Sequence, residues 1–170
     1  MAPQENTPRI YIANPYGFTA FGHLAIREIR NALPATWEII DPFEQGSPLE
    51  EKIVELAQRN HISLRDMKSE LHPVNNLIGS NNEKLISDVD AVLAIIDGEP
   101  PDVGVCAEIG FAFARGKPIV ALRTDTRVCG DNVASVINLQ VVYFIEASGG
   151  GIVFSLEQAA EMLQKVTKHN

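Results

Sequence analysis

Six consecutive apolar residues, Ala91 to Ile96, limit what this chain can fold into more than any other segment. Such a run, closed by the turn-forming pair Asp97-Gly98, is typical of a strand that is buried on both faces of a parallel sheet. An apolar helical pattern follows from Val105 to Arg115, and Gly116 fits the left-handed position that ends a helix. A buried strand followed by a helix predicts an α/β protein.

One acidic residue, Glu108, interrupts this apolar helix near its start. The pattern puts Glu108 in the first helical turn, at the edge of the sheet where open α/β sheets bind ligands. A buried carboxylate is costly unless it is used, and a helix N-terminus favours the ionised form that a nucleophile needs. A solvated glutamate that only stabilises the helix dipole explains the pattern equally well, so both interpretations stay open.

Helical patterns alternate with five strand patterns along the chain. The strands are expected at residues 9–13, 37–40, 91–96, 119–122 and 139–145, with a flexible Gly-rich turn at 148–151. Capping boxes at Ser47 and Ser155 begin two of the helices. The alternation predicts a flavodoxin-like, doubly wound sheet of five parallel strands flanked by helices, and the strand order 2-1-3-4-5 is taken from that class of fold.

The composition disfavours several kinds of partner. The net charge of −8 argues against binding to nucleic acid or to an anionic membrane surface, because both need clustered Lys and Arg. No signal peptide or membrane-spanning run is visible, and two cysteines, Cys106 and Cys129, fit a reducing compartment, so we expect a cytoplasmic protein. Residues 1–8 are expected to be a disordered lead and residues 9–170 a single domain.

Residues 60–80 have no strand pattern and only a short helical stretch, from Leu64 to Leu71. We interpret this segment as an insert and as a candidate lid over the site. A lid would keep water away from a reactive intermediate.

Several common catalytic motifs do not occur in the sequence. It contains no Gly-x-Gly-x-x-Gly, no Walker loop, no Gly-x-Ser-x-Gly and no histidines at metal-ligand spacing. A carboxylate nucleophile with a second carboxyl as proton donor is the equipment of a retaining glycosidase, and strand ends of this chain carry such groups. Asp97 is interpreted as a turn residue, whereas Asp102 is either a helix-start residue or a catalytic one. The polar residues expected at these strand ends are Tyr11, Asn14, Tyr16, Asp97, Asp102 and Glu108.

Several motifs resemble those of the nucleoside 2-deoxyribosyltransferase family, over about residues 9–145. The most specific is Asp102-x-Gly104-x-x-x-Glu108-x-Gly. The others are Ile10-Tyr-Ile-Ala-Asn-Pro15, Asp41-Pro-Phe43, Asp90 to Gly98, Gly116-Lys-Pro-Ile119 and Gly130-Asp-Asn-Val133. The resemblance implies transfer of the 2-deoxyribosyl group between purine and pyrimidine bases of 2′-deoxynucleosides, in nucleotide salvage. It also implies a covalent glycosyl-Glu108 intermediate, a ping-pong cycle and retention of configuration.

The resemblance also implies roles for individual residues. Glu108 would be the nucleophile, Tyr11 would hold it by a hydrogen bond, and Asp102 would shuttle a proton to the leaving base. Asn132 would reach the site of a neighbouring subunit, which implies a dimer-based homo-oligomer. The implied partners are 2′-deoxynucleosides and free nucleobases, with no cofactor and no metal. The implied substrate-binding residues are Asn14, Tyr16, Asn82, Gly104, Asp131 and Asn132.

One position departs from the family pattern. Asn82 stands where related enzymes often have an aspartate that contacts the base, and an amide cannot supply a titrating proton, so acid catalysis rests more on Asp102. Two alternative functions stay open. One is an N-glycosidase for 2′-deoxynucleoside 5′-monophosphates, with Arg123 and Arg127 as candidate phosphate ligands. The other is a non-catalytic nucleotide-sensing module of the same fold.

Overall fold

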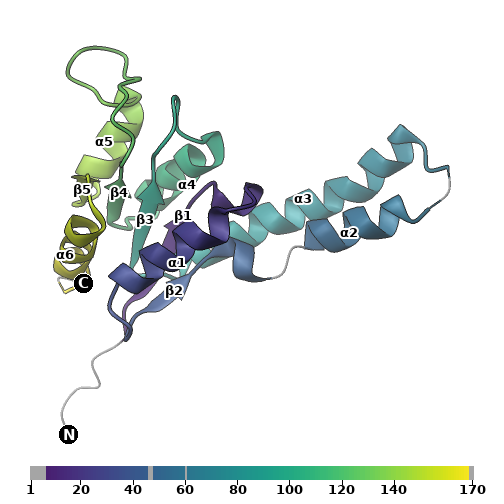
Figure 1. The fold of residues 1–170 in the computed structure, drawn as a ribbon, viewed down its shortest axis with the longest axis horizontal. Coiled ribbons are helices and arrows are strands. Elements are labelled where there is room, and N and C mark those ends of the chain that lie inside the picture. Colours follow the sequence, from purple (N-terminus) through teal and green to yellow (C-terminus); the bar gives the residue numbers. More distant parts are fainter. Residues whose placement is uncertain (1–6, 46–47, 60, 169–170) are drawn as a thin grey trace, which may run out of the picture.

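The computed structural model describes residues 7–45, 48–59 and 61–168. Its centre is a sheet of five parallel strands in the order β2-β1-β3-β4-β5, as expected for a doubly wound α/β fold (Figure 1). Residues 1–6 of the expected disordered lead lie outside the described residues. The strands are β1 (Arg9–Ala13), β2 (Glu38–Ile40), β3 (Ala91–Ile95), β4 (Ile119–Leu122) and β5 (Gly151–Val153).

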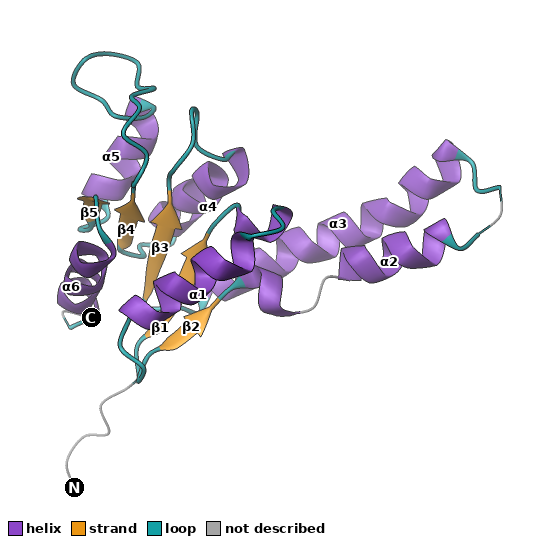
Figure 2. Ribbon diagram, in the orientation of Figure 1, coloured by secondary structure: helices purple, strands orange, loops and turns teal. Residues whose placement is uncertain are grey.

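Helices cover both faces of the sheet (Figure 2). Helices α1 and α6 pack on one face, and α4, α5 and the end of α3 pack on the other. Two short 3-10 turns follow the ends of β1 and β2. These elements are α1 (Gly22–Ala32), α2 (Pro48–Ala57), α3 (Leu64–Ser87), α4 (Val103–Ala114), α5 (Leu139–Ala147), α6 (Leu156–Thr167), η1 (Tyr16–Phe18) and η2 (Pro42–Gln45).

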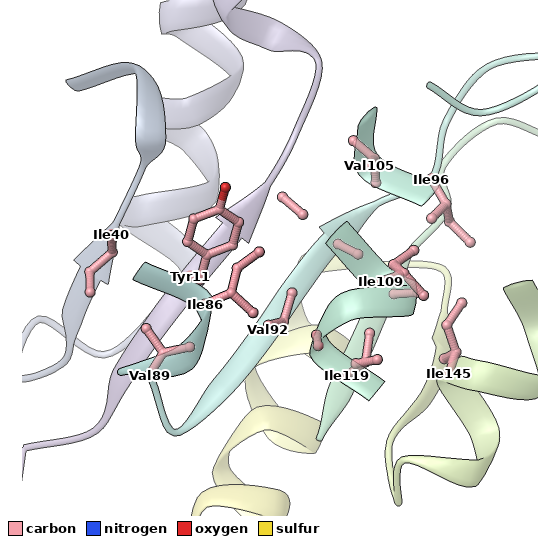
Figure 3. Close-up of a cluster of buried hydrophobic side chains, with 14 of the residues drawn as sticks. Tyr11, Ile40, Ile86, Val89, Val92, Ile96, Val105, Ile109, Ile119 and Ile145 are labelled. Carbon is pink, nitrogen blue, oxygen red and sulfur yellow. The ribbon is translucent and has the colours of Figure 1, made fainter. Parts of the chain in front are cut away.

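The two faces of the sheet carry separate hydrophobic clusters, because successive side chains of a strand point to opposite sides. In β1, Ile10 and Ile12 pack against α1 and α6. Tyr11 lies on the other face, among the apolar side chains of α3 and α4 (Figure 3). A shift of β1 by one residue would move Tyr11 to the wrong face, so the register of the sheet determines which helix this phenol can reach.

The segment 61–80 is helical from Leu64 onward, well beyond the short helical stretch predicted over residues 64–71. It forms most of α3, a helix of 24 residues capped by the Ser63 side chain. Helix α2 packs beside it, and Glu70 of α3 pairs with Lys52 at 2.7 Å and with Arg59. The two helices form a hairpin that projects away from the sheet (Figure 1), so the expected lid over the strand ends is wrong. The cap expected at Ser47 lies outside the described residues.

The fifth strand is not where the sequence pattern predicted it. Residues 139–145 belong to α5, which begins after Asn138, whose side chain accepts hydrogen bonds from the next turn of backbone. Phe144 of α5 stacks on Phe113 of α4 with ring centroids 4.9 Å apart. The fifth strand is instead β5, which begins at the last residue of the turn expected at 148–151. Packing against α4 has overridden the strand propensity of the Val, Tyr, Phe and Ile side chains in this segment.

Buried Arg123 ties the end of β4 to the loop that follows β3. The residue is 1% exposed, and its guanidinium donates hydrogen bonds to the backbone carbonyls of Ile96, Gly98 and Arg127. In the same loop the Asp97 carboxylate accepts hydrogen bonds from the backbone that follows β4, which gives this side chain a structural role. These bonds fix the loop that leads from β3 into α4.

We expect Arg123→Met to reduce the free energy of unfolding by about 3 kcal/mol, because it leaves buried carbonyl groups without donors. Urea denaturation measures this change. Arg127→Met is the matched control, since that side chain is 61% exposed and its ion pairs contribute less than about 1 kcal/mol. Equal stability of the two variants would show that the buried guanidinium does not hold the loop.

Candidate active site

Glu108 lies where β1, α3 and α4 meet. Helix α4 begins at Val103, and its cap is Asp102, whose side chain accepts the Val105 N–H at 3.0 Å. The helix-start interpretation of Asp102 is therefore confirmed. Glu108 is in the second turn of α4 instead of the expected first turn, and the effect of the helix dipole falls off over that distance.

Two side chains hold one oxygen of the Glu108 carboxylate. The Tyr11 hydroxyl donates to Oε1 at 2.7 Å, and the Asn82 amide donates to the same Oε1 at 3.2 Å. Among the described residues, no donor reaches Oε2. Figure 3 shows the Tyr11 ring inside the apolar cluster, with its hydroxyl at the rim. A half-buried carboxylate held in this way is not the solvated glutamate of the helix-dipole interpretation.

Burial raises the pKa of Glu108 from 4.5 to about 7, because desolvation disfavours the charged form. The hydrogen bonds from Tyr11 and Asn82 lower the pKa but do not outweigh burial, and the negative charge of Asp102 raises it further. The expectation that the helix N-terminus keeps this group ionised is therefore wrong. The pKa of the Tyr11 phenol is also raised, by burial and then by Glu108, so its hydroxyl remains a donor.

This arrangement can do nucleophilic chemistry. A carboxyl group with a pKa near 7 is about half ionised at neutral pH, and the ionised form has one oxygen held and the other unengaged by the described residues. Asp102 is close enough for its charge to act on Glu108, so a second carboxyl group is at hand. A pair of carboxyl groups in different environments is the usual equipment for acid and nucleophile roles.

The loop after β1 carries Asn14 and Tyr16. Asn14 is 5% exposed, and its amide donates to the Ile12 carbonyl and to Asp41 while its oxygen accepts the Tyr16 N–H. Its polar atoms thus shape the loop, and the expected role in binding substrate stays a prediction. Tyr16 is half-buried, and its pKa is raised by burial and by the charge of Asp97.

A cavity of about 410 Å³ lies between η1, α1 and η2, not at Glu108. Tyr16 lines it together with Arg27, Arg30, Asp41 and Phe43 among others. Tyr16 is the one predicted site residue in its lining. We therefore place the candidate reaction centre at the Glu108 carboxylate, because its hydrogen bonds and pKa suit a reactive group. The size of the cavity alone does not make it the reaction centre.

Gly104 is the second residue of α4 and lies beside the cap. A Cβ atom here would be 3.0 Å from Oδ1 of Asp102, so glycine leaves room for the capping carboxylate. This contact gives Gly104 a local structural role. The expected role in binding substrate stays a prediction.

Asp131 and Asn132 lie in the loop that follows β4. Asp131 accepts the Leu139 N–H at 2.7 Å, and Asn132 accepts the Ala134 N–H at 2.9 Å. Within the described part of one subunit, neither side chain is hydrogen-bonded to Glu108. The contribution of Asn132 to a neighbouring subunit's site stays a prediction.

Sequence reasoning missed the contact between Asn82 and Glu108. Asn82 lies one helical turn before Ile86, which is buried in the cluster that contains Tyr11. This i, i+4 spacing was the signal that could have placed its amide at the site.

The described residues contain no group of three or more His, Cys, Asp or Glu side chains that could hold a metal ion. None of the described helices combines the length and apolar character needed to cross a membrane.

The fold and the site together define a doubly wound α/β protein with a held, partly buried carboxylate at the carboxyl edge of its sheet. The family model "Nucleoside 2-deoxyribosyltransferase" matches residues 10–140. The chain belongs to this family, and it is accordingly an enzyme that transfers or hydrolyses glycosyl groups. The matched range includes Tyr11, Asn82, Asp102 and Glu108. No curated protein sequence matches the chain significantly.

Several solved structures share the fold. A conserved protein from Enterococcus faecalis V583 is 23% identical with a TM-score of 0.66, and the match covers 94% of this chain and 99% of that one. The 2-deoxyribosyltransferase from Bacillus psychrosaccharolyticus is 17% identical with a TM-score of 0.60, covering 89% and 90%. The CMP N-glycosidase from Clostridium botulinum is 17% identical with a TM-score of 0.50, covering 93% and 97%. At these identities the likeness establishes the fold alone.

We expect Glu108→Gln to stabilise the protein at high pH. The pKa of Glu108 is about 7 in the folded state, against 4.5 as the reference for the unfolded state. Below pH 4.5 the residue therefore has no effect on the free energy of unfolding. Between pH 4.5 and pH 7 this free energy declines as pH rises, because the folded state resists ionisation. Above pH 7 the buried charge costs about 3 kcal/mol. Gln carries no charge, and its oxygen can still accept the Tyr11 hydroxyl.

Urea denaturation at pH 5 and pH 8 checks this prediction. Glu108→Gln should exceed the wild type by up to about 3 kcal/mol at pH 8, and the difference should fall to about 1 kcal/mol at pH 5. Glu83→Gln, an exposed position on α3, is the control and should show no such trend. A difference that is equal at both pH values would exclude a raised pKa at Glu108.

Proposed function

We propose that this protein transfers the 2-deoxyribosyl group between purine and pyrimidine bases of 2′-deoxynucleosides, with Glu108 as the nucleophile. The observation that carries the proposal is the Glu108 carboxylate held through Oε1 by Tyr11 and Asn82. Membership of the nucleoside 2-deoxyribosyltransferase family supports the class of substrate. The activity would serve nucleotide salvage, and two free cysteines fit the cytoplasmic location that we propose with it.

In the first half of the reaction, Oε2 of ionised Glu108 attacks C1′ of the donor nucleoside on the face opposite the base. The bond between C1′ and the base nitrogen breaks, and its electron pair stays on the base, which takes a proton that Asp102 relays from solvent. A 2-deoxy sugar has no 2-hydroxyl group to withdraw electrons from the oxocarbenium-like transition state. The product of this step is a deoxyribosyl ester of Glu108 and a free base.

In the second half, a nitrogen of another base attacks C1′ and Glu108 leaves as a carboxylate, while Asp102 relays the proton of the attacking nitrogen to solvent. Two displacements at C1′ give retention of configuration and a ping-pong cycle. Tyr11 and Asn82 donate to Oε1 and so stabilise the negative charge that returns to the carboxylate. Tyr16 is our candidate for the base side of the site, and Asn132 for completion of a neighbouring site in a dimer-based homo-oligomer.

Chromatography of deoxyinosine plus adenine tests the proposal. Wild-type protein should produce deoxyadenosine and hypoxanthine, and Glu108→Ala should lower this exchange by about a thousandfold or more, because the covalent intermediate can no longer form. Glu83→Ala is the matched control and should retain the wild-type rate. An unaffected rate in Glu108→Ala would end the proposal.

The contacts of Arg123 and Arg127 argue against the alternative function, a 2′-deoxynucleoside 5′-monophosphate hydrolase, because these two arginines were its candidate phosphate ligands. Arg123 is buried, with its guanidinium bonded to backbone carbonyls, so its assignment as a phosphate ligand is wrong. Arg127 pairs with Asp125 and, at 3.4 Å, with Glu99. The Arg127 pair holds the pKa of Asp125 well below its usual range, so this cation already has an anionic partner.

We expect deoxycytidine and deoxyadenosine to be better substrates than dCMP and dAMP. The phosphate of a monophosphate finds no unpaired arginine at positions 123 and 127, and it is repelled by the negative charges of Glu108 and Asp102. We therefore expect kcat/KM for the monophosphates to be lower by about tenfold or more, which corresponds to about 1.4 kcal/mol. Base release and base exchange are measured side by side. Faster turnover of the monophosphates would favour the hydrolase. A thermal shift with nucleoside but without turnover would favour a sensing module.

A further inference from the structure

We infer that Asn82 is a positioning residue that, together with Tyr11, fixes Glu108 by Oε1 and so leaves Oε2 as the attacking atom. The inference rests on the proposed function of Glu108 and deepens it. It also changes the expected role of Asn82, which the family resemblance assigned to the base and which the structure places on the nucleophile.

The position of Asn82 is well defined by the core. Ile86, one turn later on α3, is 1% exposed and packs in the same cluster as Tyr11, so this part of α3 is fixed against the sheet. From there the Asn82 amide nitrogen lies 3.2 Å from Oε1 of Glu108. An ionised carboxylate can only accept hydrogen bonds, so the amide nitrogen, and not the amide oxygen, must face it.

The two donors reach the same oxygen from different elements. Tyr11 comes from β1 and Asn82 from α3, and their bonds to Oε1 are 2.7 and 3.2 Å long. Rotation of the carboxylate group would break both bonds at once. The held orientation therefore presents Oε2, the oxygen that no described donor reaches, to the substrate.

An amide suits this position better than a carboxyl group because the surroundings of Glu108 are already acidic. The titratable groups that face it are Tyr11 from β1 and Asp102 at the start of α4, and Asp41 after β2 acts on Tyr11 in turn. An aspartate at position 82 would compete with Glu108 for a proton, because two adjacent carboxyl groups do not both ionise readily. Asn82 donates a hydrogen bond without taking a proton.

Two variants and one control test the inference. Asn82→Ala removes the donor, and Asn82→Asp replaces it with a competing acid. Glu83→Gln changes the charge of the next residue on α3, which is exposed. The direct readout is a ¹³C NMR titration of the Glu108 carboxyl group, assigned with Glu108→Gln, which does not depend on activity.

We expect the titration midpoint of Glu108 to rise by about one pH unit in Asn82→Ala, because a hydrogen bond to the charged form is lost. In Asn82→Asp the two neighbouring carboxyl groups titrate in two steps, and the higher of the two midpoints should rise further. In Glu83→Gln the midpoint of Glu108 should stay unchanged. For base exchange by Asn82→Ala, kcat at pH 7 should fall about fivefold, as the ionised fraction falls from about half to about a tenth, and should recover at pH 9.

The inference would be overturned if the folded Asn82 variants left the titration midpoint of Glu108 unchanged and raised only KM for the donor nucleoside. That result would indicate that Asn82 contacts the base, as the family resemblance implied. Thermal melting establishes that each variant is folded, and either variant alone is sufficient for the decision. Failure of the proposed function gives a different result. In that case the wild type exchanges no bases, while the NMR titration still decides whether Asn82 holds Glu108.

Discussion

The 2.7 Å hydrogen bond between Tyr11 and Glu108 is the interaction on which the candidate site depends. It joins residues 97 positions apart in the sequence. It can form only because β1 pairs in parallel with β3, with Tyr11 opposite Val92, and because alternation along β1 turns Tyr11 toward α4. The register of a parallel sheet thus decides the geometry of a carboxylate on a helix.

The environment of Glu108 balances two opposing effects. Burial makes the charged form costly, and donors from β1 and α3 recover part of that cost. The result is a pKa of about 7, at which the group is neither permanently charged nor permanently neutral. Asp102, occupied by capping α4 yet close enough to act on Glu108, adds to the same balance. The residues that set the pKa of Glu108 also pack or cap the elements of the fold, so a substitution at one of them affects both stability and this pKa.

The sheet and the candidate nucleophile were predictable because each leaves a local signal. A strand buried on both faces has an unbroken apolar run, as from Ala91 to Ile96, and a lone acid in an apolar helix, as at Glu108, is conspicuous. Residues 139–145 misled because their strand propensity is high, whereas the helix is decided by the Asn138 cap and by packing on Phe113. Helix α3 was predicted only in part, because polar residues interrupt its pattern.

The pKa of Glu108 and the role of Asn82 were beyond local patterns, since both depend on which elements meet in space. The Tyr11, Asn82 and Glu108 side chains come from the first strand, a mid-chain helix and a later helix. No fragment that lacks one of these elements contains the assembled group. The base exchange proposed for this site would consequently report on native packing: a partly folded chain that lacks one of these elements, however much secondary structure it retains, would be inactive.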